Sequence, residues 1–303
     1  MSTPSPQPEQ QRIDARAEIV GDGMPIHRAL PSRLRRMVGP WCFLDHIGPT
    51  SLAQAGPLHV GPHPHIGLQT VTWLIAGEIL HRDSLGTEQL IRPGQLNVMT
   101  AGRAISHSEE SPATPPDEMH GVQFWIALPD DSRHVAPMFD HYPTLPVIER
   151  DGLHMTLIVG ELLGQQSPAR SYSPTLGLDI QAQAGASIEL PLREDFEYAV
   201  FMLVGAGEVD GQPLPAESLM YLGSARNTLS LRTSAAARFM LIGGLPFAQP
   251  VLMWWNFVAR TQAEIIQACE DWNGGHAAFG EVQGYAYGPR LQAPMPPWIK
   301  PED

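Results

Sequence analysis

The chain has 303 residues, which is long enough for two domains that each bury a core of their own. Its 32 acidic and 19 basic residues give a formal net charge of −13, which disfavours direct binding of nucleic acid but leaves a protein partner open. No apolar run approaches the roughly 18 residues of a membrane-spanning helix, so no membrane association is predicted.

Turn-forming residues are frequent along the whole chain. The 30 prolines and 28 glycines lie among short apolar runs, a composition that predicts many turns between short strands, as in β-sandwiches and β-barrels. Residues 1–16 begin polar and proline-rich, without the basic and apolar parts of a signal peptide, and are expected to form a flexible tail. Cys42 and Cys269 could pair, but the sequence has no disulfide framework, so a cytoplasmic location is expected.

The first elements follow this tail. Residues 13–20 read as a strand that ends in a turn at 21–23. Residues 24–36 then concentrate four of the chain's arginines. We interpret them as a solvated loop or as partners of the acidic surface, in preference to an anion-binding patch.

Two short motifs give the strongest functional signal, His63-x-His65 and His107-x-Glu109. Successive side chains of a β-strand point to opposite faces, so each pair projects from one face of its strand. If the two strands are neighbours in one barrel, three imidazoles and one carboxylate converge inside it. These donors suit one divalent transition metal, such as iron, manganese, nickel, copper or cobalt, and leave positions for water, substrate or dioxygen.

Other roles for histidines in this region stay open. A histidine on a strand is more often a hydrogen-bonded core or surface residue than a metal ligand. His59, His81 and His120 are also close enough in the sequence to face a cavity. For His81, the alternatives are a place near the metal and a hydrogen bond to Asp83 or to the backbone.

The strands that carry the motifs can be placed further. Pro64 has no backbone donor, so its strand is expected at a sheet edge or at an irregular ladder position. Glu109 could be a surface carboxylate like its neighbour Glu110. Strand alternation favours Glu109 as the residue that shares a face with His107.

The second half repeats the pattern of short strands. Residues 129–146 contain prolines and charges with few periodic apolar residues, and we place the crossing between two barrels there. The predicted domains are residues 17–142, a metal-binding barrel, and residues 143–303, a barrel without a His-x-His motif. Thr261 and Glu264 have the spacing of a capping box, which predicts a short helix ending at 273–275.

Several longer runs carry a family resemblance. They are His63-Pro-His-Ile-Gly-Leu-Gln-Thr-Val-Thr-Trp-Leu-Ile-Ala-Gly-Glu78, His81-Arg-Asp-Ser-Leu-Gly86, Met99-Thr-Ala-Gly-Arg-Ala-Ile-Ser-His-Ser-Glu109, Gly121-Val-Gln-Phe-Trp-Ile-Ala-Leu-Pro129 and Gly243-Gly-Leu-Pro-Phe-Ala-Gln-Pro-Val251. In order and spacing these runs resemble the pirin family of the cupin superfamily. The resemblance implies an all-β fold of two tandem cupin (jelly-roll) β-barrels, here with a short C-terminal helix.

The resemblance also implies a metal site. Its ligands would be His63, His65, His107 and Glu109, and the usual metal is iron. Family members commonly have Arg and Glu where this chain has Ile66 and Gln69. Neither position is a ligand, so metal binding is expected to persist while the orientation of the ligands and the local charge change.

Two functions from different classes follow from this resemblance. The first is a metal-dependent dioxygenase of the quercetin 2,3-dioxygenase type, acting with dioxygen on a flavonol or another hydroxy-ketone or catechol-like molecule, with Glu109 as the catalytic base. The alternative is an iron-containing, redox-responsive regulator of a transcription factor or a metabolic enzyme. An enzyme needs an open, partly apolar cavity over the metal, whereas a regulator needs only a closed site. A third reading makes the metal a structural staple, which barrels of this length do not require.

Overall fold

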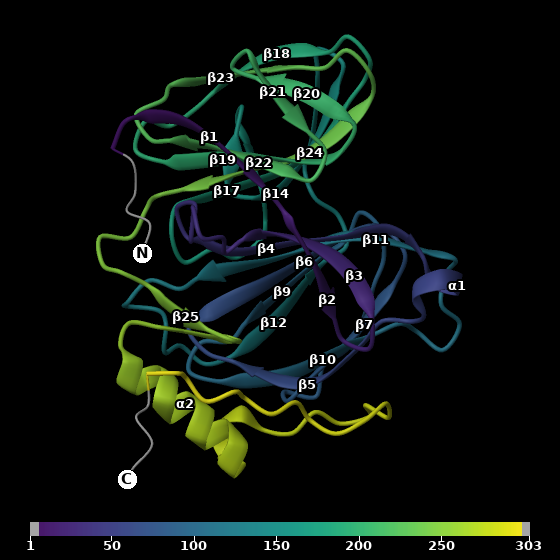
Figure 1. The fold of residues 1–303 in the computed structure, drawn as a ribbon, viewed down its shortest axis with the longest axis vertical. Coiled ribbons are helices and arrows are strands. Elements are labelled where there is room, and N and C mark those ends of the chain that lie inside the picture. Colours follow the sequence, from purple (N-terminus) through teal and green to yellow (C-terminus); the bar gives the residue numbers. More distant parts are fainter. Residues whose placement is uncertain (1–5, 299–303) are drawn as a thin grey trace.

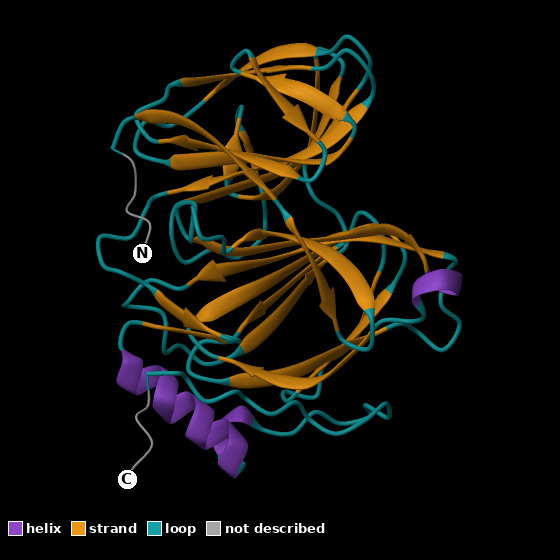
Figure 2. Ribbon diagram, viewed as in Figure 1, coloured by secondary structure: helices purple, strands orange, loops and turns teal. Residues whose placement is uncertain are grey.

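A computed structural model describes residues 6–298. Figure 1 shows two β-barrels, one above the other, with the two ends of the described chain on the same side of the molecule. Strands dominate each barrel, and the helices lie at the periphery (Figure 2). The prediction of an all-β fold with two cupin-type barrels and a short C-terminal helix is therefore confirmed.

The lower barrel in Figure 1 is built from two facing sheets. The seven-stranded sheet has the order β12 (Met138–Tyr142), β9 (Leu96–Thr100), β6 (Leu68–Ala76), β11 (Glu118–Ala127), β4 (Trp41–Ser51), β3 (Met24–Leu30) and β2 (Arg16–Val20). The four-stranded sheet has the order β5 (His59–His65), β10 (Ile105–Glu110), β7 (Ile79–Asp83) and β8 (Glu88–Ile91). The one-turn helix α1 (Leu52–Ala55) connects β4 to β5.

The upper barrel repeats this architecture. Its seven-stranded sheet has the order β1 (Pro8–Asp14), β22 (Ser218–Gly223), β19 (Glu197–Val204), β24 (Ala237–Gly244), β17 (Thr175–Ala182), β14 (Leu153–Val159) and β13 (Val147–Arg150). Its four-stranded sheet has the order β18 (Ser187–Pro191), β23 (Thr228–Arg232), β20 (Ala206–Val209) and β21 (Gln212–Pro215). A small hairpin, β15 (Glu161–Leu162) and β16 (Gln165–Gln166), completes it.

The two ends of the chain do not follow the predicted domain division. Residues 8–14, predicted as part of a flexible tail, form β1 and pair with β22 of the upper barrel; residues 1–5 lie outside the described residues. The C-terminal segment, predicted as part of the second barrel, returns to the lower barrel after β24. There it forms β25 (Leu252–Trp254), β26 (Phe257–Ala259), α2 (Gln262–Gly274) and a 3-10 helix (Ala277–Phe279). The order of the elements in the sequence does not predict that each end of the chain packs on the other barrel, because that packing depends on which sheet edges are left unpaired.

The arginine-rich region follows its interpretation only in part: Arg33, Arg35 and Arg36 lie in an irregular loop, where Arg33 and Arg36 are exposed. Residues 24–30 are not a solvated loop but strand β3, which pairs with β4. The Arg28 side chain is largely buried and makes two hydrogen bonds of 2.7 Å to the carboxylate of Asp45. The arginine is therefore committed to an ion pair inside the lower barrel.

A continuous core joins the barrels. Buried side chains from both meet at the interface, among them Trp41, Leu44, Trp73, Phe124, Ile158, Phe201, Tyr221 and Ile242. Polar contacts cross it too, including a 2.9 Å hydrogen bond from Trp73 Nε1 to Asp179. Because this interface is apolar and hydrogen-bonded, the two barrels pack as one body.

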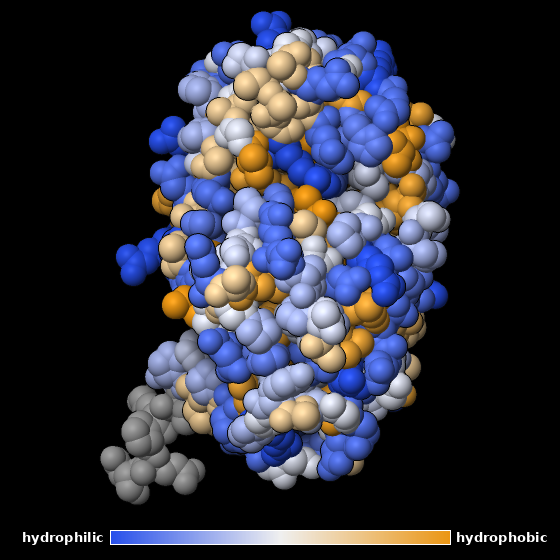
Figure 3. Space-filling view, turned by 90° about the vertical axis from the view of Figure 1, so that its right-hand side faces the viewer, coloured by the Kyte–Doolittle hydropathy of each residue, from blue (hydrophilic) through white to orange (hydrophobic). Residues whose placement is uncertain are grey.

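The outer surface has a different character. Hydrophilic residues predominate on the face shown in Figure 3, with hydrophobic ones scattered among them.

Cys42 and Cys269 are both buried as free thiols. In the part of the chain that the structure describes, no helix combines the length and the apolar character that crossing a bilayer requires.

The C-terminal helix forms as the sequence predicts. Thr261 and Glu264 make the reciprocal hydrogen bonds of a capping box, and Gly275 ends the helix in a left-handed conformation. Cys269 and Trp272 face the lower barrel and pack in a cluster with Phe257 and Phe279. The helix thus fixes the C-terminal segment beneath the barrel, as Figure 2 shows.

Glu264 is expected to make this helix sensitive to pH. Burial raises the pKa of its carboxyl, but the backbone N–H groups of Arg260 and Thr261 and the Arg133 guanidinium outweigh burial and lower it to about 2. The carboxylate therefore contributes stability above its unfolded pKa of about 4.5, and that contribution disappears as the pH falls toward 2. We expect Glu264→Gln to lower the free energy of unfolding by about 1–2 kcal/mol at neutral pH.

Urea unfolding of this variant tests the prediction. The difference from wild type should shrink between about pH 4.5 and pH 3, because the wild-type carboxylate then loses its advantage. Glu270→Gln removes an exposed carboxylate from the same helix and should change stability little at either pH. A Glu264→Gln deficit that is constant with pH would contradict the assigned charge effect.

Candidate metal centre

The two histidine motifs lie on neighbouring strands. In the antiparallel pair of β5 and β10, His63 is directly opposite His107, and His65 is opposite Ile105. Strand β5 is at the edge of the four-stranded sheet, as the proline at position 64 predicts. The inward-facing histidines of both strands therefore project into the same barrel.

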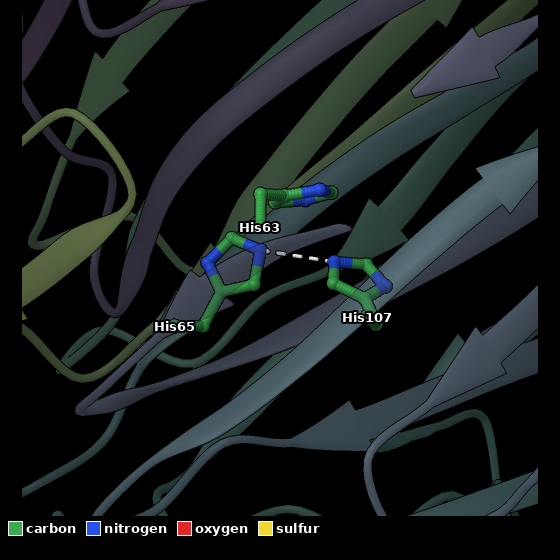
Figure 4. A group of neighbouring side chains, drawn as sticks. All are labelled: His63, His65 and His107. Atoms are coloured by element: carbon green, nitrogen blue, oxygen red, sulfur yellow. Dashed lines mark hydrogen bonds between the residues drawn. The ribbon is translucent and has the colours of Figure 1, made fainter. Parts of the chain in front are cut away.

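Three imidazole rings converge at this point (Figure 4). The Nε2 atoms of His65 and His107 are 3.0 Å apart, and the ring centroids of His63 and His107 are 4.3 Å apart. One donor nitrogen from each of the three lies within 4.8 Å of the others. All three side chains are buried, so bulk water does not lie between them.

Hydrogen bonds to the other ring nitrogen define the tautomers. His63 Nδ1 is 2.9 Å from the carbonyl oxygen of Gly61, and His65 Nδ1 is 3.0 Å from that of Asn256. A carbonyl only accepts, so each Nδ1 carries the proton and each Nε2 keeps its lone pair. Asn256 belongs to the returning C-terminal segment, which gives that segment a direct part in orienting His65.

The second ring nitrogen of His107 is also held by a hydrogen bond, in this case to another histidine, His81. Its Nδ1 is 3.4 Å from Nδ1 of His81, whose Nε2 is 3.1 Å from the Asp83 carboxylate. If His81 donates from Nε2 to Asp83, its Nδ1 accepts the proton of His107 Nδ1, which leaves a lone pair on His107 Nε2. His81 therefore makes the expected hydrogen bond to Asp83 and also contacts a histidine of the cluster.

These histidines fit a divalent metal. Burial lowers the pKa of His63 to about 4 and holds the pKa values of His65 and His107 well below the usual range, so all three are neutral. Two Nε2 lone pairs that face each other at 3.0 Å repel unless something positive lies between them. A divalent transition-metal ion satisfies these nitrogens at once, and ligating histidines are held in this way through their second nitrogen.

Glu109 lies beside His107, but its carboxylate is grouped with His81 and His107 and not with the set formed by His63, His65 and His107. A bulge follows His107 in the pairing of β10 with β5, and a Glu109 oxygen lies within 4.8 Å of donor nitrogens of His81 and His107. Thr72 Oγ1 is 3.4 Å from its carboxylate, and burial raises its pKa. Glu110 points away, as strand alternation predicts, but it is buried and pairs with Arg82 instead of lying on the surface.

The hydrogen-bond chain through His81 leads to a prediction about metal affinity. His81→Phe keeps a ring that can stack on Phe139, from which the His81 centroid is 4.5 Å, but removes the acceptor for His107. Loss of such a partner typically weakens metal binding 10–100-fold. We expect a weakening of about that size in a competition titration with a chelator.

His59→Phe is the matched control for this titration. His59 is also a histidine of the four-stranded sheet, but it stacks on Tyr287 at a centroid distance of 3.8 Å and contacts none of the three clustered histidines in the described residues. Its replacement should leave the affinity unchanged. Equal affinities in wild type and His81→Phe would show that His81 does not orient His107.

A cavity opens above the histidines. It has a volume of about 310 Å³ and is lined by the three histidines, Glu109 and mainly apolar side chains. Phe43 and Trp125 form one wall, with their rings stacked at 4.0 Å and 11°. The exposed residues Gly21 and Leu291 lie at its margin, so the cavity reaches the surface.

Sequence reasoning missed part of this lining. Arg28 and Asp45 form their ion pair at the cavity, and Arg28 also lies over the Phe43 ring, 4.6 Å from its centroid. Their positions opposite each other on β3 and β4 become visible only once the strands are paired. The Asn256 carbonyl carries no sequence signal at all, because it acts through the backbone.

The two departures from the family pattern lie away from the cavity. Ile66 packs against the C-terminal cluster, and Gln69 donates a 3.0 Å hydrogen bond to Thr100. Neither is among the residues that line the cavity. Having Ile66 and Gln69 in place of Arg and Glu therefore changes the charge near the histidines without changing the residues that line the cavity.

The fold and the site define a class: a pair of cupin-type barrels whose N-terminal member carries a buried cluster of histidines at a cavity. The family model for pirin matches residues 23–126, and the model for the pirin C-terminal cupin domain matches residues 177–278. The chain belongs to the pirin family.

Individual relatives agree with this assignment. The chain is 50% identical over 290 residues to a Pseudomonas aeruginosa protein provisionally named quercetin 2,3-dioxygenase, a match covering 95% of this chain and 91% of the relative. It is 39% identical over 277 residues to a pirin-like protein of Caulobacter vibrioides, covering 89% and 95%. A crystal structure titled quercetin 2,3-dioxygenase from Acinetobacter baumannii superposes with a TM-score of 0.92 at 47% identity, covering 96% of this chain and 97% of that one.

Proposed function

We propose that this protein is a metal-dependent dioxygenase of the pirin type that acts on a flavonol or on another hydroxy-ketone or catechol-like small molecule. The observation that carries the proposal is the cavity over the three histidines. Its volume of about 310 Å³ lies at the lower end of the range of small-molecule sites. A regulator that only changes its metal's oxidation state needs no such space, so the cavity favours the enzyme.

The lining of the cavity suits an aromatic substrate. Phe43 and Trp125 give the cavity an apolar wall that an aromatic substrate can contact. Arg28, Gln123 and the histidines supply polar groups at separate places in the lining. Because few polar groups are set in an apolar pocket, they would fix the orientation of the substrate more than its affinity.

Each residue has a proposed role. His63, His65 and His107 would hold a divalent metal, with Glu109 as a fourth ligand; iron is the metal expected from the resemblance, and manganese, nickel, copper and cobalt are alternatives. Such a metal supplies a Lewis acid that polarises substrate oxygens and a centre for reaction with dioxygen. Glu109, as the catalytic base, would take the proton of a substrate hydroxyl.

Burial supports the role of Glu109 as a base. Because burial raises the pKa of its carboxyl, the carboxylate has a stronger tendency to accept a proton than an exposed glutamate. Glu109 also lines the cavity. The proton therefore stays beside the substrate during the reaction.

Oxygen uptake by anaerobically purified, metal-loaded protein tests the proposal. Quercetin is added first, followed by a small panel of catechols and hydroxy-ketones. We expect metal-dependent oxygen consumption with at least one of them. A loaded site with no turnover on any substrate would overturn the enzyme proposal in favour of the redox-responsive regulator, and a search for a protein partner would follow.

A further inference from the structure

A second cluster of metal-ligand side chains lies at the interface of the two barrels. His27 on β3 and His46 on β4 are direct cross-strand partners. Successive residues of these strands alternate in direction, so Arg28 and Asp45 face the cavity while the two histidines face the upper barrel. Glu217, which precedes β22 of the upper barrel, completes the cluster.

The donor atoms of this cluster are closely spaced. His46 Nδ1 is 2.9 Å and 3.1 Å from the two carboxylate oxygens of Glu217, and His27 Nδ1 is 3.5 Å from the nearer one. One donor atom from each residue lies within 4.8 Å of the others. Ligands that each stand about 2.0–2.2 Å from a tetrahedral zinc ion are separated by about 3.3–3.5 Å, so these donors need to move little to share one ion.

The surroundings of His46 match those of a ligating histidine. Its side chain is completely buried, and its second nitrogen, Nε2, is 2.9 Å from Nε2 of His120. An imidazole that carries its proton on Nδ1 has a lone pair on Nε2, so His120 can accept a proton from His46 Nε2. A metal-ligating histidine usually donates its other N–H to such an acceptor, which directs the Nδ1 lone pair toward the ion.

We propose that His27, His46 and Glu217 bind a divalent cation, and that the ion is Zn²⁺ because two imidazoles and one carboxylate with an open fourth position suit zinc. The ligands come from both barrels, so the bound ion clamps them together. This site is separate from the histidine cluster of the cavity and does not depend on the proposed dioxygenase activity.

Counting bound zinc tests the proposal. The full chain and its variants are dialysed against buffered free Zn²⁺, and metal per chain is measured by mass spectrometry. We expect about two ions in wild type, about one in His27→Gln and in Glu217→Gln, and about one in His107→Ala, which lacks the cavity site. The double variant His27→Gln/His107→Ala should retain none.

His154→Gln is the matched control. The His154 side chain is 41% exposed, like that of His27, and lies 2.5 Å from Glu149, but both residues of that pair belong to the upper barrel. It should keep about two ions per chain. Zinc should also raise the unfolding temperature of His107→Ala but not that of the double variant, because only the former retains an ion that favours the folded state.

Two outcomes would overturn the proposal. One zinc per wild-type chain, lost with His107→Ala, would mean that His46 only bridges Glu217 and His120 by hydrogen bonds. Two ions in wild type that persist in both His27→Gln and Glu217→Gln would place the second ion elsewhere. The metal-free unfolding temperature of each variant shows whether it is folded when the ions are counted.

Discussion

His107→Ala is expected to remove the cavity metal and reduce oxygen uptake to the rate without enzyme. His107 contributes one of three converging imidazoles, and it is the one whose Nε2 faces His65 at 3.0 Å. With only two neutral imidazoles left, the remaining ligands hold the ion weakly. The metal content after anaerobic loading should fall by about one ion per chain relative to wild type, with no activity on the substrates that wild type consumes.

The barrel should stay folded in this variant. His107 is buried, so its truncation costs about 1–3 kcal/mol of stability, a small part of what two barrels with a shared core provide. Ser108→Ala alters the next residue of the same strand, which is also buried but faces away from the histidines, and should retain metal and activity. Full metal content in His107→Ala would overturn the ligand assignment.

The sequence predicted the architecture of the barrels better than the course of its ends. Short strands between Pro and Gly turns have a local signal, as does the capping box at Thr261, and both are found in the structure. The pairing of β1 with β22 and the return of the C-terminal segment to the lower barrel have none. Each depends on an unpaired edge or face about 200 residues away in the sequence, which a local pattern does not contain.

The same distinction separates the parts of the candidate site. The i, i+2 spacing of His63 and His65 reports their common face directly, because strand alternation is a local property. That His63 is opposite His107 follows from strand register, and the orientation of each ring follows from a carbonyl or a second histidine. The cross-strand pair of His27 and His46 is invisible in the sequence for the same reason, since 19 positions separate its members.

Glu109→Gln should separate catalysis from metal binding. The glutamine keeps the size of the side chain and an oxygen that can approach the metal, but it does not accept a proton. If Glu109 is the base, oxygen uptake should fall by about 10²–10⁴-fold while the metal content stays at the wild-type level. Steady-state oxygen consumption on the best substrate, combined with metal analysis of the same samples, measures both quantities.

Glu110→Gln provides the comparison that makes this result specific. It is the adjacent carboxylate, but its side chain points to the opposite face and accepts a 2.9 Å hydrogen bond from Arg82. Both variants remove one negative charge from β10, so a general effect of charge would lower the two rates alike. Only a proton acceptor inside the cavity makes Glu109→Gln slow and leaves Glu110→Gln active, and wild-type rates in Glu109→Gln would assign the base to another group.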